Sequence, residues 1–349
     1  SLYSKTERHI MHIIKIILVL SYLIHSVEVL GQGENSLDNH KIDGYRGIWF
    51  ELTQKYEYGD KYSGGLGTYT AKHVPLAIYA STVNKTFFLY GGTTSEREKH
   101  LFCMAGSFDH ETGMVSKPTV VYDKLGVDDP HDNPSIMIDD EGFIRLFVSG
   151  RVRQRPGHKF KSREPWSIDA FDMVSEEEMT YPQPWNTTQG YIHLFTKYTG
   201  VRQLYYETSK DGTHWTEDRM LAAIPVKAGE KSGHYQISNC FQERTVGTFF
   251  NRHPNGNVDI RTDLYYVQTE DLAKTWTDVN GQTLQLPIVD QGSSSMVIDY
   301  QSLEKNIYLK DMGFDDQANP ACLYVRSNGH KPGPVSAPYE WCLTRWDGN

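Results

Sequence analysis

Short apolar runs separated by polar turns recur along the chain from about Gly44 onward. The apolar runs 135–138 and 143–148 flank the acidic stretch 139–142. Two such runs around a short turn favour an antiparallel hairpin. One segment outside the N-terminal region, 175–179, has a weakly helical pattern. The sequence therefore predicts an all-β protein, with further strands over 86–90, 191–198, 204–208, 246–250 and 264–267.

Two segments repeat a specific turn, Ser209–Trp215 and Thr269–Trp276. Both resemble an Asp-box, in which an aspartate caps a tight hairpin turn and a tryptophan packs beneath it. Such turns recur in β-propellers, whose blades are four-stranded sheets. Residues 44–349 provide about 44 residues for each of seven blades, and six blades of about 51 residues also fit. We therefore expect a single seven-bladed β-propeller over 44–349, with six blades as the alternative.

The N-terminal region has a basic segment, 11–15, followed by the apolar stretch 16–24. That stretch has the length of a signal-peptide core and is too short for a comfortable membrane span. Small residues at 29–31 offer a cleavage site. We interpret 1–31 as a signal peptide with its upstream segment and 32–43 as a short linker, with a buried N-terminal helix as the alternative. The mature protein is then secreted or periplasmic in a bacterium, and not bound to a membrane.

Composition narrows the class of protein. The 349 residues contain 35 Lys and Arg against 44 Asp and Glu, a net charge of −9, which argues against a nucleic-acid binder. With 38% hydrophobic and 12% aromatic residues the chain has ample material for a core. The four cysteines include no CxxC pair, so a zinc ribbon is not indicated. Whether Cys322 and Cys342 form a disulfide stays open at this point.

The segment 151–163 holds six Lys or Arg residues, one His and no acid. One interpretation is a solvated basic loop. The other is a site for a carboxylate or sulfate, because arginine suits bidentate contacts with such anions. Arg151 directly follows a predicted strand, so we expect it at the mouth of the propeller channel.

Two histidines follow turn-forming segments. Prolines and carboxylates flank His131 in the segment 128–134, which would hold the imidazole in one tautomer and raise its pKa. A purely structural turn is the alternative there. His73 ends the glycine-containing segment 61–73, which lacks a phosphate-loop pattern, and it stands just before a predicted strand.

Tyr235 and Arg252 lie 17 residues apart, on adjacent strands if the hairpin prediction holds. A guanidinium beside a phenol favours the phenolate, so the pair is a candidate for proton transfer. The alternative is a buried tyrosine that serves packing and backbone hydrogen bonding.

Taken together, these motifs resemble the bacterial neuraminidase-repeat family of ulvan-degrading enzymes, which includes ulvan lyases, an α-L-rhamnosidase and oligosaccharide dehydratases. The resemblance covers most of residues 43–280 and rests on 44–49, 61–73, 130–134, 233–236 and 271–276. It implies a seven-bladed propeller. It also implies that His131, Tyr235 and Arg252 match lyase active-site residues, and that His73 matches the rhamnosidase histidine. The lyases have a second histidine where this chain has 150–153, which is a departure from the lyase pattern.

The activity that this resemblance implies is β-elimination on uronic-acid oligosaccharides by a carbon–oxygen lyase. It gives a 4,5-unsaturated uronate, by dehydration or by chain cleavage. We expect Arg151, His234 and Lys197 to bind the substrate, an anionic oligosaccharide with or without sulfate. We expect a monomer that requires no cofactor, although a structural Ca²⁺ is compatible with the fold. The alternatives are a rhamnosidase-like glycoside hydrolase and a non-catalytic propeller that binds sulfated glycans.

Overall fold

The computed structural model describes residues 36–45, 57–58, 72–93, 101–127, 129–198, 201–225 and 232–348. The chain divides into two compact units, Ser1–Ser36 and Leu37–Asn349, and the description below concerns the second. The expected signal peptide lies outside the described residues, as do 46–56 and 59–71. In the part of the chain that is described, no helix is both long and apolar enough to span a membrane.

The described residues form five antiparallel sheets that follow one another in chain order. Each sheet is numbered here by its place in the sequence. The first has the strand order β1-β6-β4-β3-β2, with β5 beside β4: β1 (Ser36–Lys41), β2 (Ala77–Ala80), β3 (Lys85–Gly92), β4 (Phe102–Asp109), β5 (Met114–Val115) and β6 (Thr119–Asp123). The second has the order β10-β9-β8-β7: β7 (Pro134–Ile138), β8 (Ile144–Val148), β9 (Gly157–Ser162) and β10 (Phe171–Glu177).

The remaining three sheets are simple meanders. The third contains β11 (Thr180–Thr187), β12 (Gly190–Tyr198), β13 (Arg202–Ser209) and β14 (Arg219–Ala222). The fourth contains β15 (Gln236–Phe241), β16 (Thr245–Arg252), β17 (Thr262–Thr269) and β18 (Met296–Ile298). The fifth contains β19 (Asn306–Phe314), β20 (Pro320–Ser327) and β21 (Glu340–Arg345). Single 3₁₀ turns occur at Pro130–Asp132, Pro254–Gly256 and Pro334–Ser336.

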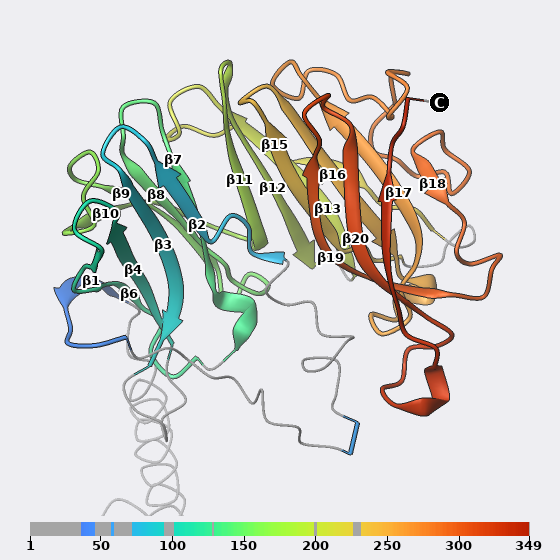
Figure 1. Ribbon diagram of the computed structural model, residues 1–349, viewed down its shortest axis with the longest axis horizontal. Helices are drawn as coiled ribbons and strands as arrows, with labels where there is room; N and C mark the ends of the chain where they lie inside the picture. The colour runs from blue at the N-terminus through green and yellow to red at the C-terminus, as the bar shows by residue number, and fades with distance from the viewer. Residues whose placement is uncertain are drawn as a thin grey trace, which may run out of the picture. The chain divides into compact units, whose positions relative to one another are not determined.

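One edge strand of each sheet contacts its counterpart in the next sheet. These inner strands are β2, β7, β11, β15 and β19, and contacts link each of them to the following one. Figure 1 shows the resulting succession of sheets, from β3 and β4 through β11 and β12 to β19 and β20. The starts of the inner strands therefore come together although they are far apart in sequence.

The hydrophobic core lies between neighbouring sheets. Leu89 and Val121 of the first sheet pack with Leu146 of the second, all of them fully or almost fully buried. Corresponding clusters join the second sheet to the third, the third to the fourth, and the fourth to the fifth. Both faces of most sheets are thus covered by apolar side chains, as expected for sheets stacked face to face.

Both predicted Asp-boxes form their turns. Asp211 Oδ1 accepts the backbone N–H groups of Thr213 and His214 at 2.8 and 2.7 Å. Asp271 Oδ1 accepts the N–H of Thr275 at 2.9 Å. Trp276 is buried against Tyr206, with ring centroids 5.3 Å apart. The turn chemistry therefore anchors an outer strand to the core.

The prediction of an all-β protein of the propeller type is confirmed, and three of the five sheets formed by the described residues are four-stranded. The blade number stays a prediction. The helical pattern at 175–179 is wrong, because 175–177 continue β10, which pairs with β9 along its length. The expected linker 32–43 contains β1, which pairs with β6, so the first sheet begins before Gly44. All four cysteines are free thiols, so Cys322 and Cys342 are not bonded.

We predict that Asp271→Ala lowers the free energy of unfolding by roughly 1–2 kcal/mol, because the substitution removes hydrogen bonds to a charged acceptor. Thermal or urea unfolding followed by tryptophan fluorescence measures the change. Asp316→Ala is the matched control, because Asp316 is an exposed loop aspartate. Equal stability of the two variants would contradict the anchoring role of the turn.

Candidate active site

Four aromatic or imidazole side chains meet where the inner strands begin. His73 precedes β2, His131 precedes β7, Tyr181 lies at the start of β11 and Tyr235 precedes β15. The Tyr181 ring lies in the middle, with its centroid 5.3 Å from His73, 5.4 Å from His131 and 5.5 Å from Tyr235. All four side chains are buried, with at most 5% of their surface exposed. We call this group the inner cluster.

Tyr181 has φ of 56°, in the left-handed region that bulky residues rarely adopt. Such a conformation costs about 1–3 kcal/mol and persists only where the surroundings impose it. The backbone N–H of Tyr181 donates to Ser149 Oγ at 3.1 Å, which helps to hold this conformation. The strain turns the ring toward both histidines, and strained residues of this kind concentrate at functional sites.

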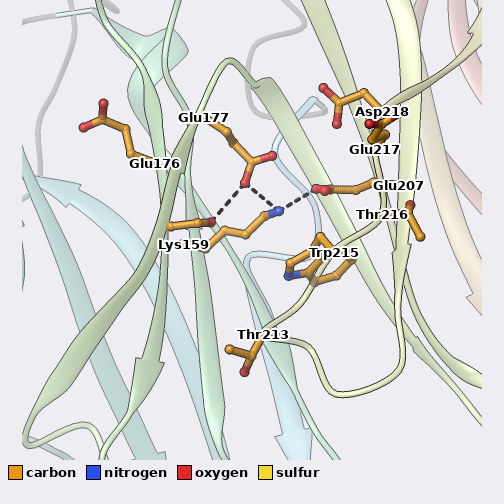
Figure 2. Close-up of a pocket in the computed structure, with 10 residues that line it drawn as sticks. Lys159, Glu176, Glu177, Glu207, Thr213, Trp215, Thr216, Glu217 and Asp218 are labelled. Atoms are coloured by element: carbon orange, nitrogen blue, oxygen red, sulfur yellow. Dashed lines mark hydrogen bonds and ion pairs between the residues drawn. The ribbon is translucent and has the colours of Figure 1, made fainter.

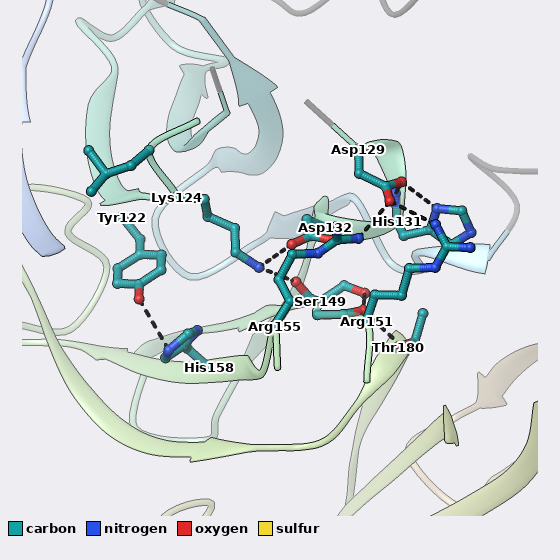
Figure 3. A network of polar contacts seen from close by, with 12 residues as sticks. Tyr122, Lys124, Asp129, His131, Asp132, Ser149, Arg151, Arg155, His158 and Thr180 are labelled. Atoms are coloured by element: carbon teal, nitrogen blue, oxygen red, sulfur yellow. Dashed lines mark hydrogen bonds and ion pairs between the residues drawn. The ribbon is translucent and has the colours of Figure 1, made fainter. Parts of the chain in front are cut away.

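A single carboxylate orients His131. Asp129 Oδ1 accepts both the backbone N–H and the Nδ1–H of His131, while its Oδ2 accepts Arg151 Nη1 at 3.0 Å and Arg155 Nη2 at 2.6 Å. Figure 3 shows these contacts together with the buried Lys124–Asp132 ion pair below them. The neutral imidazole therefore carries its proton on Nδ1, and Nε2 is the basic nitrogen.

Burial and hydrogen bonding oppose each other at this pair. Burial lowers the pKa of His131, and the hydrogen bond that the ring donates to Asp129 only partly offsets this effect. Burial also tends to raise the pKa of Asp129, but hydrogen bonds from His131 and Arg155 outweigh it and hold that pKa well below its usual range. The expectation of a raised pKa for His131 was therefore wrong in direction, because desolvation is the larger effect.

Cations surround the Tyr235 ring. Arg261 Cζ lies 4.7 Å from its centroid, Lys72 Nζ 5.5 Å and Arg202 Cζ 5.9 Å. Arg202 also donates to the Tyr198 hydroxyl at 3.3 Å, and its guanidinium stacks on that ring at 4.8 Å. Among the described residues no carboxylate pairs with Arg202. The site thus offers a half-buried guanidinium suited to an incoming anion.

His253 lies beneath Tyr235, with ring centroids 4.7 Å apart. Burial lowers the pKa of His253 well below its ordinary value, and the positive charges of Arg261, Arg202 and Lys72 add to the effect. The ring is completely buried and neutral. It therefore supports the Tyr235 ring without adding another positive charge.

Three predicted site residues lie elsewhere. Arg252 points away from Tyr235 and forms a fully buried ion pair with Asp263 at 2.8 Å. His234 accepts the N–H of Ile224 through Nε2 at 3.1 Å and donates through Nδ1 to the Asn251 carbonyl, so both ring nitrogens serve the backbone. Burial lowers the pKa of His234 to about 4. Lys197 pairs with Asp218, away from the inner cluster.

The basic segment 151–163 is largely neutralised by the protein itself. Arg151 and Arg155 both pair with Asp129. Three further residues of the segment form ion pairs: Arg153 with Glu178, Lys159 with Glu177 and Glu207, and Arg163 with Asp172. Arg151 also lies near Tyr198, with Cζ 5.7 Å from the centroid of that ring. Of the predicted anion site, Arg151 alone remains a candidate, and it already pairs with Asp129. Arg202, for which the described residues provide no carboxylate, is the stronger candidate for binding an anion.

A polar cavity of about 420 Å³ lies between the second and third sheets. Lys159 Nζ bonds both Glu177 and Glu207 there and lies 4.3 Å from the Trp215 ring, as Figure 2 shows. The oxygens of Glu177, Glu207 and Asp218 lie within 4.8 Å of one another, the spacing of a cation site. The Lys159 ammonium already occupies the position between two of these carboxylates, so we assign no metal to them.

Sequence reasoning missed Tyr181, Tyr198, Arg202 and Lys72. One signal was available for Tyr181: it stands before Pro182 at the start of an inner strand, as His73 stands shortly before Pro75 and His131 shortly before Pro134. Aligning the repeats on these prolines would have placed Tyr181 beside the two histidines. No comparable pattern marks Arg202.

The fold is that of a β-propeller, with a buried cluster of histidine and tyrosine side chains at the starts of its inner strands. The profile of the BNR repeat-containing family matches residues 101–349. The chain belongs to this family.

Individual proteins similar to this chain include ulvan lyases. An ulvan lyase of family PL25 from Pseudoalteromonas sp. (strain PLSV) is 22% identical over 318 residues, which are 79% of this chain and 63% of the relative. The chain thus spans less than two thirds of that relative's length. A solved PL25 ulvan lyase structure superposes with a TM-score of 0.65 at 18% identity, over 80% of this chain and 69% of the other. The same type of enzyme bound to -[GlcA(1-4)Rha3S]- gives 0.64 at 17% identity, over the same shares of the two chains. At these identities the solved structures establish the fold.

We predict that Arg252→Met destabilises the protein by about 3–5 kcal/mol, because it leaves the Asp263 carboxylate buried without its cation. Urea unfolding measures the loss, and the double variant Arg252→Met, Asp263→Leu should recover part of it. Arg163→Met, which breaks an exposed ion pair, serves as the control and should change stability by less than about 1 kcal/mol. A stable Arg252→Met variant that has lost activity alone would instead return Arg252 to the site.

Proposed function

We propose that this protein is a carbon–oxygen lyase that acts by β-elimination on uronic-acid-containing, ulvan-type oligosaccharides. The observation that carries the proposal is the half-buried Arg202 guanidinium beside Tyr198 and Tyr235, in reach of the histidines of the inner cluster. The similarity to ulvan lyases, one of them bound to a glucuronate-containing oligosaccharide, supports the same substrate class.

The chemistry of elimination needs three groups. A cation or hydrogen-bond donor neutralises the C6 carboxylate so that the C5 proton becomes acidic. A base removes that proton, and an acid protonates the oxygen that leaves C4. Arg202 is the best neutralising group, because its guanidinium has no carboxylate partner among the described residues. Arg151 is already bonded to Asp129 and takes a lesser part.

Tyr235 is the proton carrier in this proposal. Its ring is held between Tyr181 and His253, and the neighbouring cations favour any negative charge that develops on the phenol oxygen. His131, held neutral by burial and oriented by Asp129, polarises the carboxylate or shares the proton transfer through Nε2. His73 donates through Nε2 to the His131 carbonyl at 3.1 Å and supports that loop.

The proposal includes the surroundings in which the enzyme works. The substrate is an anionic oligosaccharide, sulfated or not, and the protein acts as an exported monomer without a required cofactor. Dehydration of a terminal uronate and cleavage of a chain use the same groups and differ in what leaves C4. We favour oligosaccharides over long polymers as substrates.

The deciding experiment is incubation of the purified protein with uronate-containing ulvan oligosaccharides. A new near-ultraviolet absorbance indicates an unsaturated uronate, and mass spectrometry then separates loss of one water from the appearance of shorter chains. No new absorbance with any uronate substrate would overturn the lyase assignment. New reducing sugar without absorbance would indicate a hydrolase, and binding without turnover a glycan-binding propeller.

We predict that Arg202→Met lowers kcat/KM for uronate substrates by roughly 10- to 150-fold, the equivalent of one charge-assisted contact of about 1.5–3 kcal/mol. Steady-state kinetics of the absorbance change measures the loss. Arg244→Met is the control, because Arg244 is exposed and pairs with Glu270 far along the fourth sheet. An unaffected Arg202→Met variant would exclude Arg202 as the neutralising group.

We predict that Tyr235→Phe folds normally, binds substrate nearly as before and loses turnover by about 100-fold or more, because it keeps the ring and removes the proton carrier. Single-turnover kinetics and thermal unfolding separate the two effects. Tyr266→Phe, which removes the hydroxyl of another buried tyrosine, bonded to Gln268, should remain active. His73→Ala should cost less than Tyr235→Phe. The opposite order of activities would favour a rhamnosidase-like hydrolase instead.

A further inference from the structure

Lys72 is a buried lysine for which the described residues provide no counter-ion. Its side chain is 2% exposed and approaches the face of the Tyr235 ring, with Nζ 5.5 Å from the centroid. Its backbone carbonyl accepts Gln183 Nε2 at 3.3 Å, and Gln183 is itself bonded to the Gln236 carbonyl, next to Tyr235. The position of Lys72 relative to Tyr235 is thus fixed through the inner strands.

The groups that act on the Lys72 ammonium are two cations and a thiol: Arg261, Lys310 and Cys322. Burial raises the pKa of the Cys322 thiol, so the thiol is uncharged at neutral pH. Burial lowers the pKa of Lys72 well below its ordinary value, and Arg261 lowers it further. Lys310 responds in the same way, because burial and Arg261 lower its pKa to about 8.

A buried ammonium without an anion is unfavourable by several kcal/mol, and the usual relief is loss of the proton. A neutral amine is a competent general base, unlike an arginine in the same place. The lowered pKa of Lys72 favours the neutral amine, which is the form that proton abstraction requires, and Lys72 Nζ lies 5.5 Å from the ring centroid of the phenol assigned to the other proton transfer.

We propose that Lys72 is the general base that removes the C5 proton of the bound uronate, while Tyr235 gives its hydroxyl proton to the oxygen that leaves C4. This inference rests on the proposed function and divides its two proton transfers between two residues. The C5–H bond breaks and an N–H bond forms on Lys72. The electron pair of C5–H becomes the C4–C5 double bond, and the C4–O bond breaks. The leaving oxygen takes the Tyr235 proton.

The step leaves an ammonium on Lys72 beside a phenolate on Tyr235. Transfer of the proton from the ammonium to the phenolate, directly or through solvent, restores both groups for the next turnover. No oxidant, reductant or further reactant is needed. The cations Arg202 and Arg261 next to the ring stabilise the phenolate while it exists.

The test compares Lys72→Arg with Lys72→Met. If Lys72 is the base, both variants lose kcat by about 100-fold or more, because an arginine stays protonated and a methionine has no basic group, although Lys72→Arg keeps a long basic side chain and a nearly unchanged KM. If Lys72 only binds an anion, Lys72→Arg keeps its activity, and the inference is overturned. Lys305→Arg, at a partly buried lysine just before β19 that bonds Asn328, is the matched control.

Chemical rescue supplies a second criterion. Methylamine added to Lys72→Ala should restore turnover in proportion to its unprotonated fraction, because it fills the space and provides the base. Absence of rescue in a variant whose thermal unfolding shows a folded protein would contradict the role. In the wild-type enzyme, kcat should rise with pH as Lys72 loses its proton. The midpoint of this rise should lie below the pKa of an ordinary lysine.

A third measurement does not depend on activity. In the full chain labelled with ¹³C-lysine, the Cε signal that disappears in Lys72→Arg should titrate well below the other lysines. A Lys72 signal that stays in the ammonium form up to alkaline pH would overturn the inference while leaving the lyase proposal intact. A neutral Lys72 in a protein that forms no unsaturated uronate would overturn the lyase proposal and, with it, the role of Lys72 in that reaction.

Discussion

The packing of apolar side chains between successive sheets is the interaction on which the site depends. Each cluster couples one sheet to the next, and the inner strands contact one another at the edge where the sheets converge. None of the residues of the inner cluster is close to another in sequence, with gaps of about 50 residues between Tyr181 and its neighbours His131 and Tyr235. Their distances of about 5 Å are thus a consequence of sheet stacking.

Charge is distributed unevenly within this frame. Elsewhere in the described residues, several buried cations have an anionic partner, as Lys124 has Asp132 and Lys159 has Glu207. Arg145 likewise pairs with Asp139. Around Tyr235 the opposite holds for Lys72 and Arg202, for which the described residues offer no carboxylate. In a protein of net charge −9, such a local excess of positive charge is an unfavourable arrangement for stability, and it is explained if an anion completes it.

Much of the fold was predictable from the sequence, because alternating runs and Asp-box turns depend on local chemistry. The hairpin over 135–148 and the turns at Asp211 and Asp271 form as expected. The prediction of a helix at 175–179 was wrong. Consecutive glutamates favour a helix by local propensity, but pairing with β9 holds Glu176 and Glu177 in β10. Their carboxylates bind His158 and Lys159. Cross-strand partners of this kind override local propensity.

The site was only half predictable, and the reason lies in side-chain direction and burial. Sequence spacing correctly placed Tyr235 and Arg252 at neighbouring strands. Tyr235 directly precedes β15, Arg252 is the last residue of β16, and the two strands pair. It could not show that Arg252 turns to Asp263, a residue of β17 that the hairpin argument did not consider. The role of cation beside the phenol falls instead to Arg202, Arg261 and Lys72, which come from other elements.

Burial also explains why acidic neighbours misled the interpretation of His131. Counting charges along the sequence favours an imidazolium, because Asp129 and Asp132 flank the ring. In the folded protein Asp132 is bonded to Lys124 and also pairs with Arg155, and Asp129 is shared with Arg151 and Arg155. The carboxylates near His131 are therefore largely paired with other cations. Desolvation of the buried ring is the larger effect, and it lowers the pKa of His131. The same balance, a buried basic group whose neighbours are cations, lowers the pKa of Lys72 well below its ordinary value. At both His131 and Lys72, therefore, burial works against the charged form of a basic group that lies near a guanidinium.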